Sequence, residues 1–211
     1  MFEKIARIGV VPVIKIEDPD RAVPLARALL QGRIPCAEIT FRTGAAQEAI
    51  RRIRREVPEI TVGAGTVLTI EQADRAIDAG AEFLVSPGFN PRVVEYALAK
   101  KTPIIPGCCT PSEMEMAIEA GLKTVKFFPA EQAGGLEFIK AVSAPYSMLS
   151  FMPTGGINAL NIAKYLAFNK VLACGGSWMA GPDLIEKGDF AQITALSAEA
   201  AEIAARVIAT R

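Results

Sequence analysis

The segment Glu82–Gly107 reads EFLVSPGFNPRVVEYALAKKTPIIPG and contains one complete unit of the fold. It opens with an apolar run of strand character. Asn90-Pro91 then marks a helix start, because asparagine caps helices and proline suits their first turn. Apolar positions recur with helical spacing as far as Lys100, and a second apolar run begins at Thr102. The stretch therefore predicts a strand, a helix and a second strand.

The same unit repeats along the whole chain. Strand-like runs begin near Val10, Cys36, Ile60, Glu82, Thr102, Lys123, Met148 and Lys170. Helical patterns stand in the gaps at Arg21–Leu30, Ala45–Glu56, Ile70–Ala79, Pro91–Lys100, Ser112–Ala120 and Asn158–Ala167. Eight such units predict an α/β fold, a (β/α)8 TIM barrel forming one domain over residues 1–211. The alternative is a doubly wound open sheet, but no GxGxxG follows the first strand and eight regular units favour closure.

The two ends of the chain fit the same plan. We expect Phe2–Ile8 to form a short helix that covers the bottom of the barrel. The alanine-rich segment Asp189–Arg211 should form the last outer helix.

Composition narrows the class of protein. The 211 residues include 23 basic and 23 acidic side chains, so the net charge of zero predicts no nucleic-acid or membrane partner. No apolar run is long enough to span a bilayer, and the N-terminus lacks a signal-peptide core. The four cysteines form no CxxC and there is no histidine, so we expect reduced thiols, no metal and no cofactor. A cytoplasmic protein is expected.

Polar side chains cluster by strand parity. Glu38, Thr40 and Arg42 share one face of the second strand, and its other face is apolar. In a barrel, alternate residues point inward and catalytic groups lie at the C-terminal ends of strands. The same reasoning turns Thr66, Lys126 and Thr154 inward on their strands. We therefore predict that these side chains meet at the inner end of the barrel.

A buried Glu38–Lys126 ion pair that only fixes strand register is the alternative. Charged groups inside a barrel are costly unless they are paired or have a task. Both residues stand near strand ends, and Arg42 with two threonines would suit a small carboxylate. These features favour a functional site.

Two glycine pairs predict a phosphate site beside it. The seventh strand ends in Pro153-Thr154-Gly155-Gly156, and the eighth ends in Cys174-Gly175-Gly176-Ser177. Glycine lets backbone N–H groups approach an anion, and barrels commonly bind phosphate with the loops after strands seven and eight. In Gly63-Ala64-Gly65-Thr66 we interpret the glycines as room for the substrate to approach the third strand.

These groups together suggest covalent chemistry. Desolvation in an apolar pocket favours a neutral amine, which can attack a ketone and form a Schiff base. Without histidine, Glu38 is the natural proton shuttle. Arg42 and Thr66 would hold the carboxylate of a 2-keto acid. The pattern suggests a class I aldolase acting on a phosphorylated 2-keto acid.

The chain resembles the 2-keto-3-deoxy-6-phosphogluconate (KDPG) and 4-hydroxy-2-oxoglutarate (KHG) aldolase family over essentially its whole length. The resemblance is carried by six segments in order: Glu38–Thr43, Gly63–Leu68, Val85–Gly88, Val125–Glu131, Pro153–Ile157 and Gly175–Trp178. It implies Lys126 as the Schiff-base lysine and Glu38 as the acid/base. It also implies Arg42, Thr66, Thr154 and Phe128 around the pyruvate portion, with Gly155, Gly156, Gly175, Gly176 and Ser177 on the phosphate.

The resemblance further implies the products pyruvate and D-glyceraldehyde 3-phosphate, a place in the Entner–Doudoroff pathway, and a cytoplasmic homotrimer. Two other interpretations stay open. One is a phosphate-binding barrel isomerase or synthase whose lysine only stabilises an anionic intermediate. The other is a catalytically silent trimeric barrel that serves as a binding module.

Overall fold

A computed structural model describes residues 1–211 and contains one strand for each predicted run. The strands are β1 Val10–Ile14, β2 Cys36–Thr40, β3 Thr61–Gly65, β4 Leu84–Val85, β5 Ile104–Ile105, β6 Thr124–Phe127, β7 Ser150–Pro153 and β8 Cys174–Gly176. All the strand pairs are parallel. The strands are almost wholly buried, as expected when a parallel sheet is covered on both faces.

The strands close into a ring. Six are hydrogen-bonded in the order β5-β4-β3-β2-β1-β8, and β6 pairs with β7. The two groups are joined at one side by a bridge between Gly107 and Lys126, and at the other by a bridge between Thr154 and Gly175. Because these bridges join β6 and β7 to both edges of the six-stranded sheet, the sheet has no free edge, and the predicted barrel is confirmed over the open sheet.

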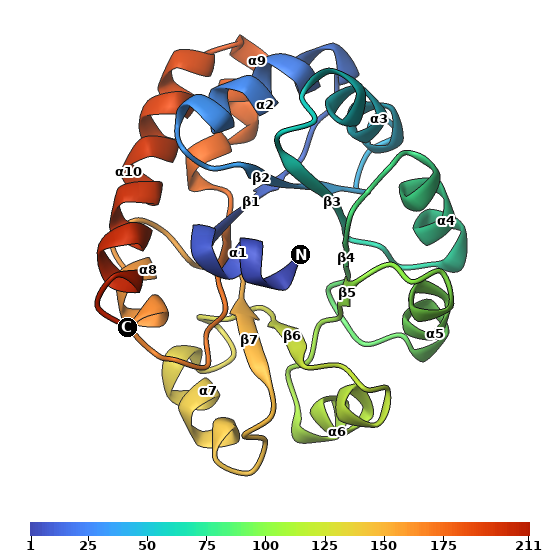
Figure 1. The fold of residues 1–211 in the computed structure, drawn as a ribbon, viewed down its shortest axis with the longest axis vertical. Coiled ribbons are helices and arrows are strands. Elements are labelled where there is room, and N and C mark those ends of the chain that lie inside the picture. The colour runs from blue at the N-terminus through green and yellow to red at the C-terminus, as the bar shows by residue number, and fades with distance from the viewer.

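Helices surround the barrel as a continuous outer ring (Figure 1). The α-helices of the chain are α1 Phe2–Ile8, α2 Ala22–Gln31, α3 Ala46–Glu56, α4 Ile70–Asp78, α5 Pro91–Ala99, α6 Pro111–Glu119, α7 Gly135–Ser143, α8 Ile162–Leu166, α9 Pro182–Lys187 and α10 Phe190–Ile208, with 3-10 turns at Pro19–Arg21 and Trp178–Ala180. The predicted helices at both ends of the chain are confirmed. Helix α1 lies across the open end of the barrel in this view.

Local sequence explains where these helices begin. Thr110 and Glu113 form a reciprocal capping box at the start of α6, with Pro111 in its first turn. The Asn90 side chain accepts a hydrogen bond from the Arg92 amide at the start of α5. Helix α8 is shorter than predicted, because Asn158 and Asn161 form a hydrogen-bonded turn that delays its first residue to Ile162.

The last helix, α10, closes the outer ring by packing against α2, the first helix of that ring. Helix α10 packs on α2, where the Thr194 hydroxyl donates to the Ala28 carbonyl. Gly32 allows this close approach, since an added Cβ would lie 2.4 Å from the Ser197 Cβ. Buried apolar side chains form one cluster of 61 residues, so we propose a single domain over residues 1–211. None of the helices is both long and apolar enough to cross a membrane.

Candidate active site

Lys126 lies near the C-terminal end of β6, inside the barrel. Its side chain is only 6 % exposed, and its Nζ atom lies 3.7 Å from the Oε1 atom of Glu38 on β2. The same Nζ atom lies 5.3 Å from the centre of the Phe128 ring. The ammonium group therefore has an acidic neighbour on one side and an aromatic face on the other.

Glu38 is fully buried. Neither of its carboxylate oxygens accepts a hydrogen bond from another protein group, and the 3.7 Å separation from Lys126 is longer than a direct hydrogen bond. A buried carboxylate usually has several donors. Glu38 thus keeps acceptor capacity beside the lysine, which is unusual for a carboxylate whose only task is structural.

Glycines on the neighbouring strand make room for this carboxylate. A Cβ added at Gly65 would lie 2.1 Å from the Oε1 atom of Glu38, and one at Gly63 would lie 2.4 Å from the Phe83 ring. Our interpretation of both glycines as room for substrate was therefore wrong. Gly65 leaves space for the Glu38 carboxylate, and Gly63 leaves space for the Phe83 ring. Sequence alone misses this, because the clearance depends on the β2–β3 register.

A cavity of about 310 Å³ opens above the lysine at the C-terminal ends of the strands. It brings together most of the residues predicted from the sequence: Arg42, Thr66, Lys126, Phe128, Thr154, Gly155, Gly156, Gly176 and Ser177. Val13, Pro87 and Ile157 also line it and were not predicted. Parity along β1 could have identified Val13. Glu38 and Gly175 do not reach the cavity wall.

Gly175 makes room for a neighbouring side chain. A Cβ at this position would lie 2.3 Å from the Oγ1 atom of Thr154. Gly175 therefore makes space for the Thr154 side chain, whose buried hydroxyl has no protein hydrogen-bond partner. Thr154 lines the cavity and is available to a bound molecule.

A hydrogen bond from Arg42 to the Thr40 side chain orients the guanidinium group. Its Nε atom donates to the Thr40 hydroxyl at 3.1 Å, and that hydroxyl donates to the Ile14 carbonyl at 2.8 Å. Thr40 thereby fixes the guanidinium group at the cavity wall, where its remaining N–H groups can face a carboxylate. The strand parity placed Thr40 on this face, but its orienting contact was not predicted.

The opposite side of the cavity offers backbone donors. Gly155 and Gly156 have φ angles of +100° and +78°. The N–H groups of Gly155, Gly156, Ile157 and Ser177 donate to no protein acceptor. Successive N–H groups in such left-handed turns form a concave site for an anion. The cavity thus has a lysine–carboxylate pair at one end and anion-binding amides at the other.

Cys36 and Cys108 do not compete with the lysine as nucleophiles. Cys36 precedes Glu38 on β2, and burial together with the Glu38 charge raises the pKa of its thiol to about 12. Burial also raises the pKa of Cys108, next to β5, to about 12. Because the thiolate is the reactive form, both side chains are inert near neutral pH.

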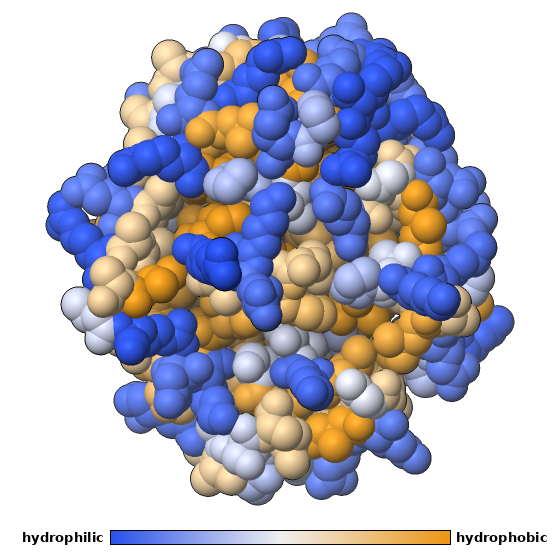
Figure 2. Space-filling view, viewed as in Figure 1, coloured by the Kyte–Doolittle hydropathy of each residue, from blue (hydrophilic) through white to orange (hydrophobic).

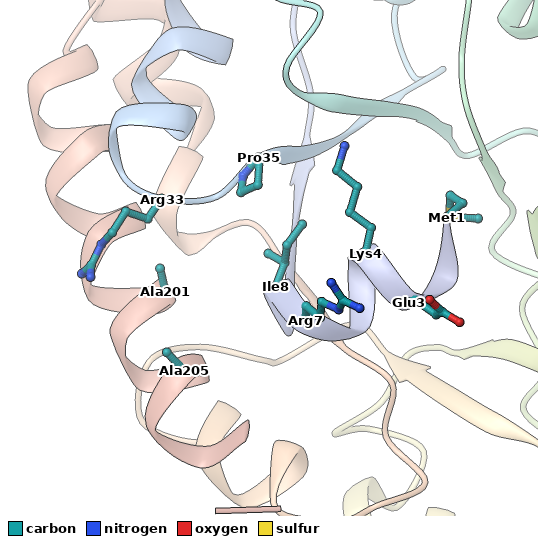
Figure 3. Close-up of a pocket in the computed structure, with 9 residues that line it drawn as sticks. All are labelled: Met1, Glu3, Lys4, Arg7, Ile8, Arg33, Pro35, Ala201 and Ala205. Carbon is teal, nitrogen blue, oxygen red and sulfur yellow. The ribbon is translucent and has the colours of Figure 1, made fainter. Parts of the chain in front are cut away.

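A second and larger cavity, of about 540 Å³, lies at the other end of the barrel beside α1 (Figure 3). Its wall includes Lys4, Arg7 and Arg33, but the labelled side chains spread apart rather than converge on one point. Hydrophilic residues dominate the rim of this face, with apolar side chains nearer its centre (Figure 2). In this fold, chemistry is placed at the C-terminal ends of strands. The smaller cavity is therefore the candidate active site.

The fold and this cavity define a (β/α)8 barrel with a buried lysine–glutamate pair and an anion-binding end. The family model described as "KDPG and KHG aldolase" matches residues 2–196, and the chain belongs to this family. The predicted family resemblance is confirmed.

Relatives and solved structures agree with this assignment. The chain is 53% identical to 2-dehydro-3-deoxy-phosphogluconate aldolase of Treponema pallidum (strain Nichols), covering 96% of this chain and 97% of the relative. It is 46% identical to KHG/KDPG aldolase of Escherichia coli (strain K12), covering 92% and 91%. The structure of KDPG aldolase from Legionella pneumophila, with pyruvate captured as a covalent carbinolamine, matches with a TM-score of 0.90 at 36% identity, covering 94% and 97%.

Proposed function

We propose that this chain is a class I aldolase that cleaves 2-dehydro-3-deoxy-6-phosphogluconate to pyruvate and D-glyceraldehyde 3-phosphate. The observation that carries the proposal is the Lys126 Nζ atom, which lines the cavity and lies 3.7 Å from the fully buried Glu38 carboxylate behind it. An amine that attacks a ketone needs such a proton acceptor and donor beside it.

The reaction begins when the neutral Lys126 amine attacks the C2 carbonyl carbon and forms a carbinolamine. Glu38 moves protons between the nitrogen and the new hydroxyl group, directly or through a water. Loss of one water gives the protonated imine. Because the imine attracts electrons, the C3–C4 bond then breaks and its electron pair forms an enamine.

Glu38 accepts the proton of the C4 hydroxyl group as that bond breaks, which releases D-glyceraldehyde 3-phosphate. The enamine is then protonated at C3. Water adds to the resulting imine, returns the amine to Lys126 and releases pyruvate. Atoms balance, because the water lost in forming the first imine is restored in this hydrolysis.

The cavity walls suit the two ends of this substrate. Arg42, Thr66 and Thr154 would hold the carboxylate of the pyruvate portion, and Phe128 would cover the imine. The N–H groups of Gly155, Gly156 and Ser177, with Gly176 beside them, would bind the phosphate. Gly175 contributes by admitting Thr154.

Removal of the amine tests this proposal. Lys126→Ala should abolish pyruvate release from the phosphorylated substrate and leave the fold intact. Lys123→Ala is the matched control, since Lys123 is an exposed lysine just before the same strand. Pyruvate release by Lys126→Ala at the wild-type rate would refute the assignment of Lys126 as the nucleophile.

A second substrate, 4-hydroxy-2-oxoglutarate, is supported by the family description and by the name of the Escherichia coli relative. Steady-state kinetics on this compound, on the phosphogluconate substrate and on its galactonate epimer would rank the three. We expect the phosphorylated substrates to have lower KM values, because only they engage the glycine loops. Equal KM values for all three would contradict the phosphate site.

We also propose, from family membership, a cytoplasmic homotrimer of the Entner–Doudoroff pathway that needs no cofactor. Light scattering on the purified chain should give about three times the 22.5 kDa monomer mass. A monomer at micromolar concentration would contradict the trimer.

A further inference from the structure

Glu131 follows the lysine strand and has no step in the proposed reaction. Its Oε1 atom accepts a hydrogen bond from the hydroxyl group of Tyr165 on α8. The Tyr165 side chain is fully buried and lies outside the cavity wall. Burial and this hydrogen bond raise the pKa of Tyr165, so its hydroxyl remains a donor at any working pH. A buried tyrosine hydroxyl without its acceptor would be costly.

The backbone around Glu131 holds the anion-binding loop. The Ala130 N–H donates to the Thr154 carbonyl at 2.8 Å, and the Glu131 N–H donates to the Gly155 carbonyl at 3.1 Å. The Glu131 side chain also packs directly against Gly156, where an added Cβ would lie 2.6 Å from the Glu131 Cγ atom. One short segment thus contacts three consecutive residues of the loop.

The side chain of Asn161, which follows the loop in sequence, also holds the loop in place. The Asn161 amide donates to the Gly156 carbonyl at 2.9 Å. The carbonyls of Thr154, Gly155 and Gly156 therefore all accept bonds from outside the loop. With these carbonyls engaged, the N–H groups of Gly155, Gly156 and Ile157 are the loop's remaining donors, and all three residues line the cavity.

Gly135 at the start of α7 lets the Tyr165–Glu131 bond form. A Cβ there would lie 3.0 Å from the tyrosine hydroxyl and 3.3 Å from the Glu131 Oε1 atom. The bond joins the segment after β6 to helix α8, which follows the loop in sequence. The loop is consequently held between two anchored segments.

We propose that Tyr165 and Glu131 are positioning residues that fix the loop Thr154–Ile157 and thereby set the preference for phosphorylated over unphosphorylated substrates. This rests on the proposed function. A loop free to move would lose the ordered set of N–H donors that an anion needs. The loss should fall mainly on the phosphate, since Lys126 lies on β6, Glu38 on β2 and Arg42 just after β2. Thr154 stays tied by its own backbone, whose N–H donates to the Phe127 carbonyl and whose carbonyl accepts from the Ala130 N–H.

The test compares two substrates in three variants. Tyr165→Phe removes one hydroxyl and should raise the KM for the phosphorylated substrate about fivefold, the change expected from about 1 kcal/mol of lost hydrogen bonding. The KM for the unphosphorylated 2-keto-3-deoxygluconate should change less than about twofold on the same reasoning. Glu131→Gln retains an acceptor oxygen and should resemble the wild type, whereas Glu131→Ala should resemble Tyr165→Phe.

Tyr146→Phe is the matched control, because the Tyr146 hydroxyl donates to Glu115 far from this loop. It should change neither KM. Inhibition by inorganic phosphate gives a second readout, and Tyr165→Phe should weaken it by the same factor as the KM for the phosphorylated substrate. Equal losses on both substrates, or no loss on either, would overturn the positioning role.

Failure of the proposed function would look different. If the wild type forms no covalent adduct with pyruvate, the aldolase mechanism is wrong. Suppose instead that the adduct forms equally in the wild type and in Tyr165→Phe, and that this substitution changes the KM of both substrates by the same factor. Then only the positioning role is wrong.

Discussion

Gly65→Ala should disable the site through a residue that touches no substrate. The added methyl group would lie 2.1 Å from the Glu38 Oε1 atom and 2.7 Å from its Cδ and Cγ atoms. Gly65 sits in β3 with an ordinary strand backbone, so alanine causes no backbone strain there. The whole effect should come from displacement of the Glu38 carboxylate.

The size of that effect follows from the geometry. To restore ordinary contact the carboxylate must move by about 1 Å, and an error of this size at a catalytic group costs about 10² in rate. We expect kcat to fall about 100-fold, or about 2.7 kcal/mol in activation free energy. Crowding in a closely packed core should also lower the free energy of unfolding by about 1–3 kcal/mol.

The assay is pyruvate release coupled to lactate dehydrogenase, with urea unfolding measured in parallel. Gly181→Ala is the control, since a Cβ there meets nothing within 4 Å. Glu38→Gln should slow the wild type by about 10²–10³ but cost far less in the Gly65→Ala background, because both changes act on one group. Wild-type kcat in Gly65→Ala, or full additivity of the two changes, would show that Gly65 does not act through the position of the Glu38 carboxylate.

Three further results are expected. Arg42→Lys loses the guanidinium fork and should raise the KM for pyruvate about tenfold in the condensation direction, and an unchanged KM would remove Arg42 from the carboxylate site. Thr110→Ala breaks the α6 capping box and should lower the urea-derived free energy of unfolding by about 1 kcal/mol. Because burial raises the pKa of Cys36 and Cys108 to about 12, a thiol reagent at pH 8 should label half-exposed Cys109 first; rapid labelling of Cys36 would contradict this.

The fold could be predicted because every βα unit repeats the same local signals. The spacing of apolar residues predicted the strands, and capping residues such as Thr110 predicted where helices begin. Helix α9 was not predicted, since its six residues carry too short a pattern. Helix α8 is shorter than predicted because the Asn158 N–H donates to the Asn161 side chain and forms a turn. The spacing of apolar residues does not reveal such a turn.

The alternation of side chains along each strand was enough to predict part of the site. Parity identified the inward faces of β2 and β6, and the structure brings Arg42 and Lys126 to one cavity. It was wrong on β3, where Gly63 and Gly65 share the inward face with Glu38 and Thr40. Thr66 reaches the cavity because it follows the strand with a left-handed backbone, at φ +55°. Parity could not show that Gly65 and Gly175 serve as clearance for Glu38 and Thr154. That information lies in the distance between atoms on neighbouring strands, which exists only once the barrel has closed.

In the proposed mechanism Lys126 forms an imine with the substrate, and this imine can be trapped by reduction. Pyruvate and sodium borohydride should irreversibly add one reduced pyruvate to the chain, and peptide mass mapping should place it on Lys126. Lys126→Ala should remain unmodified, whereas Lys123→Ala should be modified like the wild type. An unmodified wild-type chain, or an adduct on a different lysine, would contradict Schiff-base chemistry at Lys126.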